Sequence, residues 1–111
     1  MDDRRYVLIE SRDPFDSADT WFVADTATAL RARGRAVTVF LVQNGVLASR
    51  AGARLSHVPR LAEAGVTVLA DDFSLRERGI EPSELTGGAQ EAPIDALVDL
   101  LMRPDAITIW H

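Results

Sequence analysis

The hydrophobic residues of this chain fall into four short apolar runs, separated by longer stretches in which apolar residues recur at helical spacing. Each run is rich in β-branched residues and is bounded by Gly, Pro, Asn or Asp, which is typical of buried strands. Each run is also too short for a convincing helix. The pattern therefore predicts strands over residues 6–9, 36–42, 66–70 and 106–110.

A helix is predicted between the first two strands. Asp16 or Ser17 is expected to cap it, and Asp19 would lie in its first turn, where an acidic side chain favours the positive end of the helix dipole. Apolar residues then recur on one face, and Gly34 follows as a stop signal. A second, shorter helix is predicted before Gly65.

The last helix is the most regular of those predicted. It starts near Pro93, ends before Pro104, and carries on one face Ile94, Leu97, Val98 and Leu101. Residues 74–78 are predicted to form a short helix closed by a glycine. The segment 80–91 contains one proline and two glycines, so it is expected to be either a loop or a fifth, short edge strand.

Strands that alternate with helices predict a parallel sheet, because each parallel pair needs a crossover connection. We therefore expect a three-layer α/β/α sandwich built on a mostly parallel sheet of four or five strands. No linker, repeat or low-complexity tract interrupts the chain, and its 111 residues suit one domain, predicted to span residues 1–111.

Two residue types are missing from the chain, and their absence excludes several chemistries. Without cysteine there can be no disulfide, zinc–thiolate site, thiolate nucleophile or persulfide within the chain. All twelve basic residues are arginines, which excludes lysine Schiff bases and the Walker lysine of a P-loop.

Charge and hydropathy limit the expected partners. The net charge of −5 argues against nucleic acid as a direct partner. No apolar stretch approaches the roughly 18 residues of a membrane-spanning helix, and the N-terminal residues lack the apolar segment of a secretory signal. A cytoplasmic location without membrane contact is therefore expected.

Polar residues follow each predicted strand. In α/β proteins, ligands bind beyond the carboxyl ends of parallel strands, so these residues are expected to meet at one edge of the sheet. Glu10, Asp13, Gln43 and His111 belong to this edge. The candidate pocket is formed by the residues next to them: Ser11, Arg12, Asn44, Gly45, Asp71, Asp72, Phe73 and Ser74.

The adjacent acids Asp71 and Asp72 are the most distinctive feature of this edge and allow two interpretations. The two carboxylates could couple as an acid–base pair or supply oxygen ligands to a hard cation. Alternatively, one of them caps the short helix near Ser74 and the other is solvated, which by itself explains an aspartate at this place. The second interpretation is favoured, and no metal site is predicted.

No cofactor is predicted. The loop after the first strand carries Asp13, Pro14 and Asp16, which oppose a phosphate, so flavin mononucleotide is not expected. The chain has no G-x-G-x-x-G dinucleotide motif. A phosphoacceptor receiver domain would need a lysine after its last strand, so that function is excluded as well.

The histidines and tryptophans are expected to have mainly structural roles. His57 is expected at the surface or at a helix cap, and the terminal His111 is expected to be disordered. Trp21 and Phe22 lie about 100° apart on a helix, so they cannot share one core stripe. One of them, together with Trp110, is expected to contact another protomer.

Several segments along nearly the whole chain resemble the DsrE/DsrF/DsrH family, which includes the TusB, TusC and TusD subunits of the tRNA-thiolation sulfur relay. The matching segments are residues 6–10, 32–34, 37–41, 44–46, 64–69, 74–80 and 105–110. The more specific marks are Arg78-Gly79-Ile80 after the third strand, Asn44-Gly45-Val46 after the second, and a final strand that closes on Trp110.

The resemblance implies a flavodoxin-like domain without flavin that assembles into trimers or hexamers with itself or with related subunits, and that works with a sulfur-carrier protein. In the sulfur-carrying members a cysteine follows the third strand, and counting back from Gly79 places that position at Asp71. A carboxylate cannot hold a persulfide. We therefore expect a non-catalytic subunit or binding module; the alternative is a small-molecule or metal-binding protein, or an enzyme, that uses Asp71 and Asp72.

Overall fold

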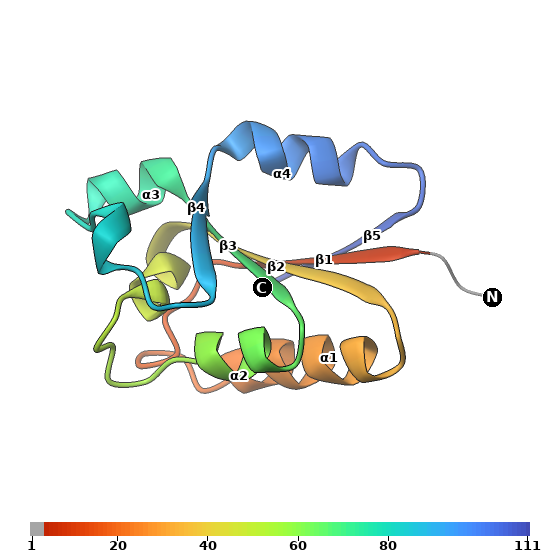
Figure 1. Cartoon of the computed structure of the whole chain (residues 1–111), viewed down its shortest axis with the longest axis horizontal. Helices are drawn as coiled ribbons and strands as arrows, with labels where there is room; N and C mark the ends of the chain where they lie inside the picture. The colour runs from red at the N-terminus through yellow and green to blue at the C-terminus, as the bar shows by residue number, and fades with distance from the viewer. Residues whose placement is uncertain (1–3) are drawn as a thin grey trace.

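Five parallel strands form one sheet in the order β4-β3-β2-β1-β5 in the computed structural model, which describes residues 4–111. The strands are β1 (Arg5–Glu10), β2 (Ala36–Leu41), β3 (Thr67–Asp71), β4 (Ala89–Ala92) and β5 (Ala106–Trp110). Helices α1 (Thr20–Ala32) and α2 (Val58–Glu63) cover one face, and α4 (Ile94–Leu101) covers the other (Figure 1). The predicted three-layer α/β/α sandwich is confirmed.

Alternating side chains divide the core between the two faces of the sheet. On β1, Leu8 packs with the α1 and α2 side, whereas Val7 and Ile9 pack with Leu97 of α4. The same alternation runs through β2 and β3, since successive side chains of a strand point to opposite faces. The alternation therefore determines whether the side chain of a residue at a strand end lies on the α1 and α2 side or on the α4 side of the sheet.

The segment 80–91 ends in a true edge strand. It contains the short 3₁₀ helix η2 (Pro82–Glu84) and runs into β4, which pairs with β3 in the register Val68–Ala89 to Asp71–Ala92. Of the two predicted alternatives, the fifth strand is correct. Gly88, with φ +117°, precedes this strand and lies too close to Ala62 for a side chain of its own.

Most predicted elements are present with shifted ends. Helix α1 begins at Thr20 with Asp19, rather than Asp16 or Ser17, at its N-cap position, so the predicted cap and the predicted place of Asp19 in the first turn are wrong. The carbonyl of Asp13 accepts the backbone N–H groups of Asp16 and Ser17 in a turn before the helix. The short helix α3 (Asp72–Glu77) begins earlier than predicted, directly after β3. A 3₁₀ helix, η1 (Gln43–Ser49), was not predicted.

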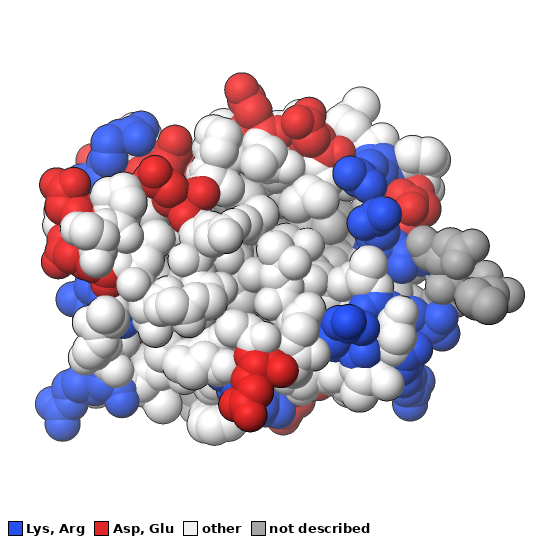
Figure 2. Space-filling view, in the orientation of Figure 1, with Lys and Arg blue, Asp and Glu red and all other residues white. Residues whose placement is uncertain are grey.

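Charged side chains lie mainly around the rim of the face shown in Figure 2, and a broad area in the middle of this view carries none. Acidic residues and arginines are both present at the rim, so no single-sign surface covers this face. Within residues 4–111, no helix has the length and apolar character needed to cross a membrane. Residues 1–3, which belong to the segment considered as a secretory signal and to the predicted domain, lie outside the described residues.

Candidate functional site

Asp71 is the last residue of β3 and the N-cap residue of α3. The alternation along β3 turns Val68 and Ala70 toward the α1 and α2 side, so Asp71 faces the α4 side. Its Oδ2 accepts a hydrogen bond from the backbone N–H of Ser74 at 3.0 Å and another from the Ser74 hydroxyl at 2.6 Å. Asp71 thus caps α3, as the favoured interpretation of the acid pair predicted.

Ser74 links this cap to the end of the neighbouring strand. Its Oγ accepts a hydrogen bond from the backbone N–H of Gln43 at 2.9 Å while donating to Asp71. Gln43 has φ +50° and is the only non-glycine with positive φ among residues 4–111. Gln43 therefore has an unusual backbone conformation where its N–H donates to Ser74 Oγ.

A pocket of about 470 Å³, here called the Asp71 pocket, lies on the α4 side of this edge. Its apolar lining comes from the ends of three elements and from α4 itself: Val42, Phe73, Ile94, Leu97 and Trp110. Its polar lining consists of Gln43, Asp71, Ser74, Glu77 and Arg78. The volume lies within the range of small-molecule sites.

One oxygen of Asp71 has no partner in this pocket. Asp71 is 6% exposed, and its buried Oδ1 receives no hydrogen bond from any residue in the range 4–111. Arg78, the one cationic residue of the lining, is already engaged: it donates to Asn44 Oδ1 from Nε and Nη2 and to the Ser74 carbonyl from Nη1. Because Asp71 Oδ1 is unpaired and the Arg78 guanidinium is already hydrogen-bonded, the pocket offers a ligand mainly hydrogen-bond acceptors.

Asp72 does not share the pocket with Asp71. It lines a separate hollow with Gly79 and Glu91, and its carboxylate lies 3.7 Å from Arg76, one helical turn further on. The two carboxylates therefore do not form a joint site in this structure. No cluster of three His, Cys, Asp or Glu side chains suited to a metal ion occurs among residues 4–111.

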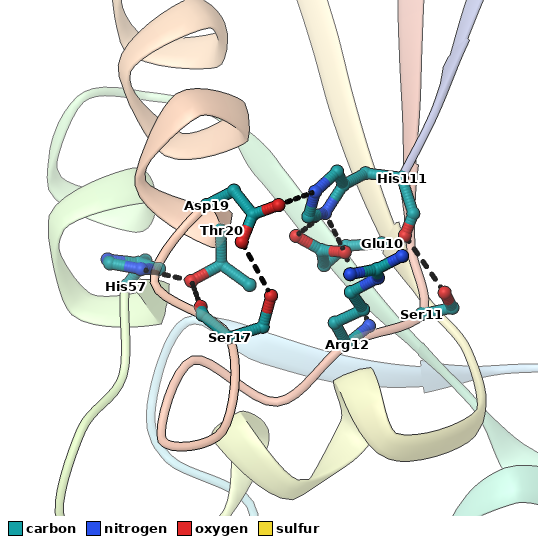
Figure 3. Close-up of polar contacts among 8 residues, drawn as sticks. All are labelled: Glu10, Ser11, Arg12, Ser17, Asp19, Thr20, His57 and His111. Atoms are coloured by element: carbon teal, nitrogen blue, oxygen red, sulfur yellow. Dashed lines mark hydrogen bonds and ion pairs between the residues drawn. The ribbon is translucent and has the colours of Figure 1, made fainter.

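A second polar cluster lies at the same edge but on the α1 side (Figure 3). The buried carboxylate of Glu10 contacts His111 Nδ1 at 2.8 and 3.0 Å, and His111 Nε2 lies 3.5 Å from Asp19. The backbone of His111 donates to Ile9 and accepts from Ser11, both main chain and hydroxyl. The prediction that His111 is disordered is therefore wrong, because both its ring and its backbone are bonded.

Asp19 completes this cluster from the start of α1. The Ser17 hydroxyl donates to Asp19 Oδ1 at 2.9 Å and is the main reason that the pKa of the Asp19 carboxyl lies below its ordinary value of 3.8. Its backbone hydrogen bond and nearby His111 lower this pKa further, against a small opposing effect of burial. With carboxylates at both ring nitrogens, His111 joins β1, β5 and α1 rather than presenting a free base.

His57 is buried behind this cluster. It is 8% exposed, its Nε2 lies 3.1 Å from the hydroxyl of Thr20, and Trp21 packs edge-on against its ring at 4.5 Å. Burial is the main cause that lowers the pKa of His57 below 6.5, and the positive charge of Arg60 adds to it. The predicted surface or capping role is therefore wrong: His57 sits at the N-cap position of α2 but its side chain makes no capping bond.

Arg12 and Gly45, both predicted for the pocket, lie beside a different and much smaller cavity of about 20 Å³ that also touches Glu10 and His57. That volume is enough for about one water molecule. Gly45 approaches the carbonyl oxygen of Glu10 so closely that a Cβ would overlap it. Gly45 therefore allows the end of β1 and η1 to meet.

The predicted site residues thus divide between two places. Asp71, Phe73 and Ser74 line the Asp71 pocket, and Asn44 contributes by holding Arg78. Ser11, Arg12 and Gly45 belong to the α1 side, and Asp72 faces away from both. Gln43, which the sequence places at this edge, also lines the pocket. The pocket residues that the sequence analysis misses are Val42, Glu77, Arg78, Ile94, Leu97 and Trp110. Strand parity could have indicated Trp110, whereas the pattern of α4 predicts only a core helix.

Comparisons with known proteins identify the fold. No family model matches the chain, and no curated protein matches it. Among solved structures, it resembles the YchN protein of E. coli with a TM-score of 0.86 and 19% identity, covering 97% of this chain and 99% of YchN. It also resembles MTH1491 of Methanobacterium thermoautotrophicum, a protein of unknown function, with a TM-score of 0.81 and 21% identity over 98% of this chain and 100% of that one.

A third solved structure is BT1422 of Bacteroides thetaiotaomicron, also of unknown function, with a TM-score of 0.72 and 17% identity over 96% of this chain and 94% of the other. At these identities the likeness concerns the fold. The chain therefore shares the fold of these three proteins, a three-layer α/β/α sandwich on a parallel sheet, over nearly its full length.

Proposed function

We propose that this protein is a DsrE-like binding module or oligomeric subunit of a sulfur-relay type assembly that does not itself carry sulfur. One observation supports it most: the residue at the carboxyl end of β3, where the resemblance expects the sulfur-carrying cysteine, is Asp71, and it opens into a pocket of about 470 Å³. At this position the chain has a pocket but no thiol.

The chemistry of sulfur transfer supports the non-catalytic part of this proposal. Sulfur relay through a protein needs a thiolate that accepts and releases a persulfide sulfur, and the chain contains no cysteine. The Asp71 carboxylate has no sulfur to offer, and its Oδ2 is committed to capping α3. The proposed contribution is therefore binding and assembly, in the cytoplasm.

Exposed apolar side chains support association with other subunits. On α4, Ile94, Val98 and Met102 follow one another at helical spacing and are 50%, 48% and 77% exposed. Trp110, 66% exposed, lines the Asp71 pocket together with Ile94, so this apolar surface is continuous with the pocket. The proposed partners are further copies of this chain, related cysteine-bearing subunits and a sulfur-carrier protein.

Native mass spectrometry tests this proposal. The purified chain would be measured alone and after mixing with cysteine-bearing relatives from the same genome, with an unrelated α/β protein of similar size as the control. We expect a trimer, a hexamer or a mixed complex with the relatives and none with the control. A strict monomer that captures no relative would overturn the proposal.

In the alternative proposal the protein binds a small molecule or a metal, and one observation favours part of it. The unpaired Oδ1 of Asp71 in a pocket of suitable size supports small-molecule binding. A site that uses both carboxylates has no such support, because Asp72 lies in a separate hollow beside Arg76. The alternative therefore reduces to a ligand held by Asp71.

A further inference from the structure

The two oxygens of the Asp71 carboxylate have different surroundings. Oδ2 accepts both the backbone N–H and the hydroxyl of Ser74, whereas Oδ1 is buried and has no hydrogen-bond donor among residues 4–111. A buried carboxylate oxygen is rarely left without a partner, because it has lost its contact with bulk water. Oδ1 therefore points to a donor supplied from outside the chain.

The charges around the Asp71 pocket favour a positively charged donor. Asp71 and Glu77 contribute two carboxylates, and no ion pair of Glu77 occurs among the described residues. Arg78 is the one cation of the lining, and its guanidinium is held by Asn44 and by the Ser74 carbonyl. With two carboxylates and one guanidinium, the lining has a formal charge of −1, which favours a cation over an anion.

The apolar side of the pocket favours an organic ligand over a bare ammonium ion. Phe73 and Trp110, 59% and 66% exposed, line the pocket together with Ile94, the first residue of α4. Aromatic faces attract both flat apolar groups and organic cations. The side chains of Phe73 and Trp110 are more than half exposed, so they offer open ring surface to a ligand in the pocket.

We propose that the Asp71 pocket binds a small organic cation, an amine or amidinium attached to a flat apolar body. Its N–H groups donate to Asp71 Oδ1, and its body lies against Phe73 and Trp110. This inference rests on the binding-module part of the proposed function and not on the sulfur-relay part, so each can fail without the other.

Isothermal titration calorimetry with two cationic probes, benzamidine and phenethylamine, tests the inference. Benzoate serves as the matched anion, since it has the same ring and the opposite charge. We expect saturable binding of at least one cation and at least tenfold weaker binding of benzoate. If neither cation binds, or if benzoate binds as tightly, the inference is overturned.

Two neighbouring variants locate the binding. Asp71→Asn removes the negative charge but keeps an acceptor for the Ser74 N–H, so the cap of α3 should survive. We expect it to weaken cation binding at least tenfold. Asp72→Asn removes the same charge one residue away, from a carboxylate outside the pocket, and should leave the affinity unchanged. The reverse pattern would contradict the proposal.

The wild-type protein also supplies an internal readout, which is needed if Asp71→Asn does not fold. The chain has two tryptophans, and only Trp110 lines the Asp71 pocket, whereas Trp21 packs on His57. On adding the bound cation, the indole N–H signal of Trp110 should shift in the NMR spectrum while that of Trp21 stays. Shifts of Trp21 alone would overturn the inference.

Discussion

At the scale of single residues, Gly45 shows how the absence of a side chain shapes the candidate edge. It is buried in η1 against the end of β1, where the carbonyl oxygen of Glu10 occupies the place of a Cβ. That carbonyl also accepts the backbone N–H of Val42, and the N–H of Gly45 bonds to the Val42 carbonyl. The requirement at Gly45 is close approach of two backbones rather than an unusual φ.

Gly45→Ala should therefore destabilise the protein by roughly 1–3 kcal/mol, the usual cost of adding volume to a packed site. Urea unfolding would measure it. Gly87→Ala is the matched control, since a Cβ at Gly87 meets nothing within 4 Å, and it should change stability by less than about 0.5 kcal/mol. Equal effects of the two substitutions would show that the close contact at Gly45 is unimportant.

His57 gives a second prediction at this scale, because burial lowers its pKa below 6.5. The unfolded chain then binds a proton more readily than the folded one. Above about pH 6.5 the imidazole is neutral in both states, and as the pH falls from there toward the folded pKa the free energy of unfolding decreases. His57→Gln keeps a partner for Thr20 and cannot titrate.

The measurement is the free energy of unfolding between about pH 7.5 and 5.5, the range around the ordinary histidine pKa. We expect it to fall more steeply in the wild type than in His57→Gln. The difference between the two slopes removes the contribution of every other group, including His111. Parallel slopes would mean that the pKa of His57 is not lowered by folding.

The sequence predicted single-residue roles unevenly. The role of Asp71 as a cap was readable, because an N-cap aspartate is a local feature that Ser74 completes three residues later. The contact between Glu10 and His111 was not readable, since it joins opposite ends of the chain through the pairing of β1 with β5. Neighbours in the sheet, rather than neighbours in the sequence, create such contacts.

At the scale of elements, α3 depends on the strand before it. The helix is only six residues long, too short to be stable alone, and it begins where β3 ends. The Asp71 cap satisfies the Ser74 N–H, and Ser74 in turn receives the Gln43 N–H from the end of β2. The cap thus joins α3 to two strands at once.

Asp71→Ala should consequently cost about 1 kcal/mol of stability, within the range for removing an N-cap acceptor. Asp71→Asn should stay closer to the wild type because it retains an acceptor. Thermal and urea unfolding of the three proteins would test whether stability falls in the order wild type, Asp71→Asn, Asp71→Ala. An alanine variant as stable as the wild type would remove the argument that the cap holds α3.

The limits of the sequence prediction differ between elements. Apolar runs identify four strands to within one residue. In β1, β2 and β3 burial leaves this signal, whereas β5 is an apolar edge strand without a buried residue, so the expectation that it is buried is wrong. The sequence does not decide β4, because an exposed edge strand of four residues keeps only Ala89 and Ala92 buried. Its pairing with β3, which no local pattern records, makes it a strand.

At the scale of the whole molecule, both helical layers expose apolar side chains, and the stripe beside α4 adjoins the Asp71 pocket. On the α1 side, Phe22 is 64% exposed, and Trp21, 48% exposed, packs on His57 and lies near Arg60. On the α4 side, Ile94, Val98 and Met102 form an exposed stripe next to Trp110. Exposed apolar surface of this kind marks interaction sites in proteins.

Val98→Glu should therefore weaken the proposed self-association while leaving the fold intact, because it places a charge in the middle of this stripe without changing a buried residue. Sedimentation velocity over a range of concentrations would measure the loss, with circular dichroism as the check on folding. Gln90→Glu adds the same charge at an exposed position on β4 and should leave association unchanged. If Val98→Glu associates like the wild type, the α4 stripe is not the interface, and the exposed aromatic residues of α1 become the surface to test.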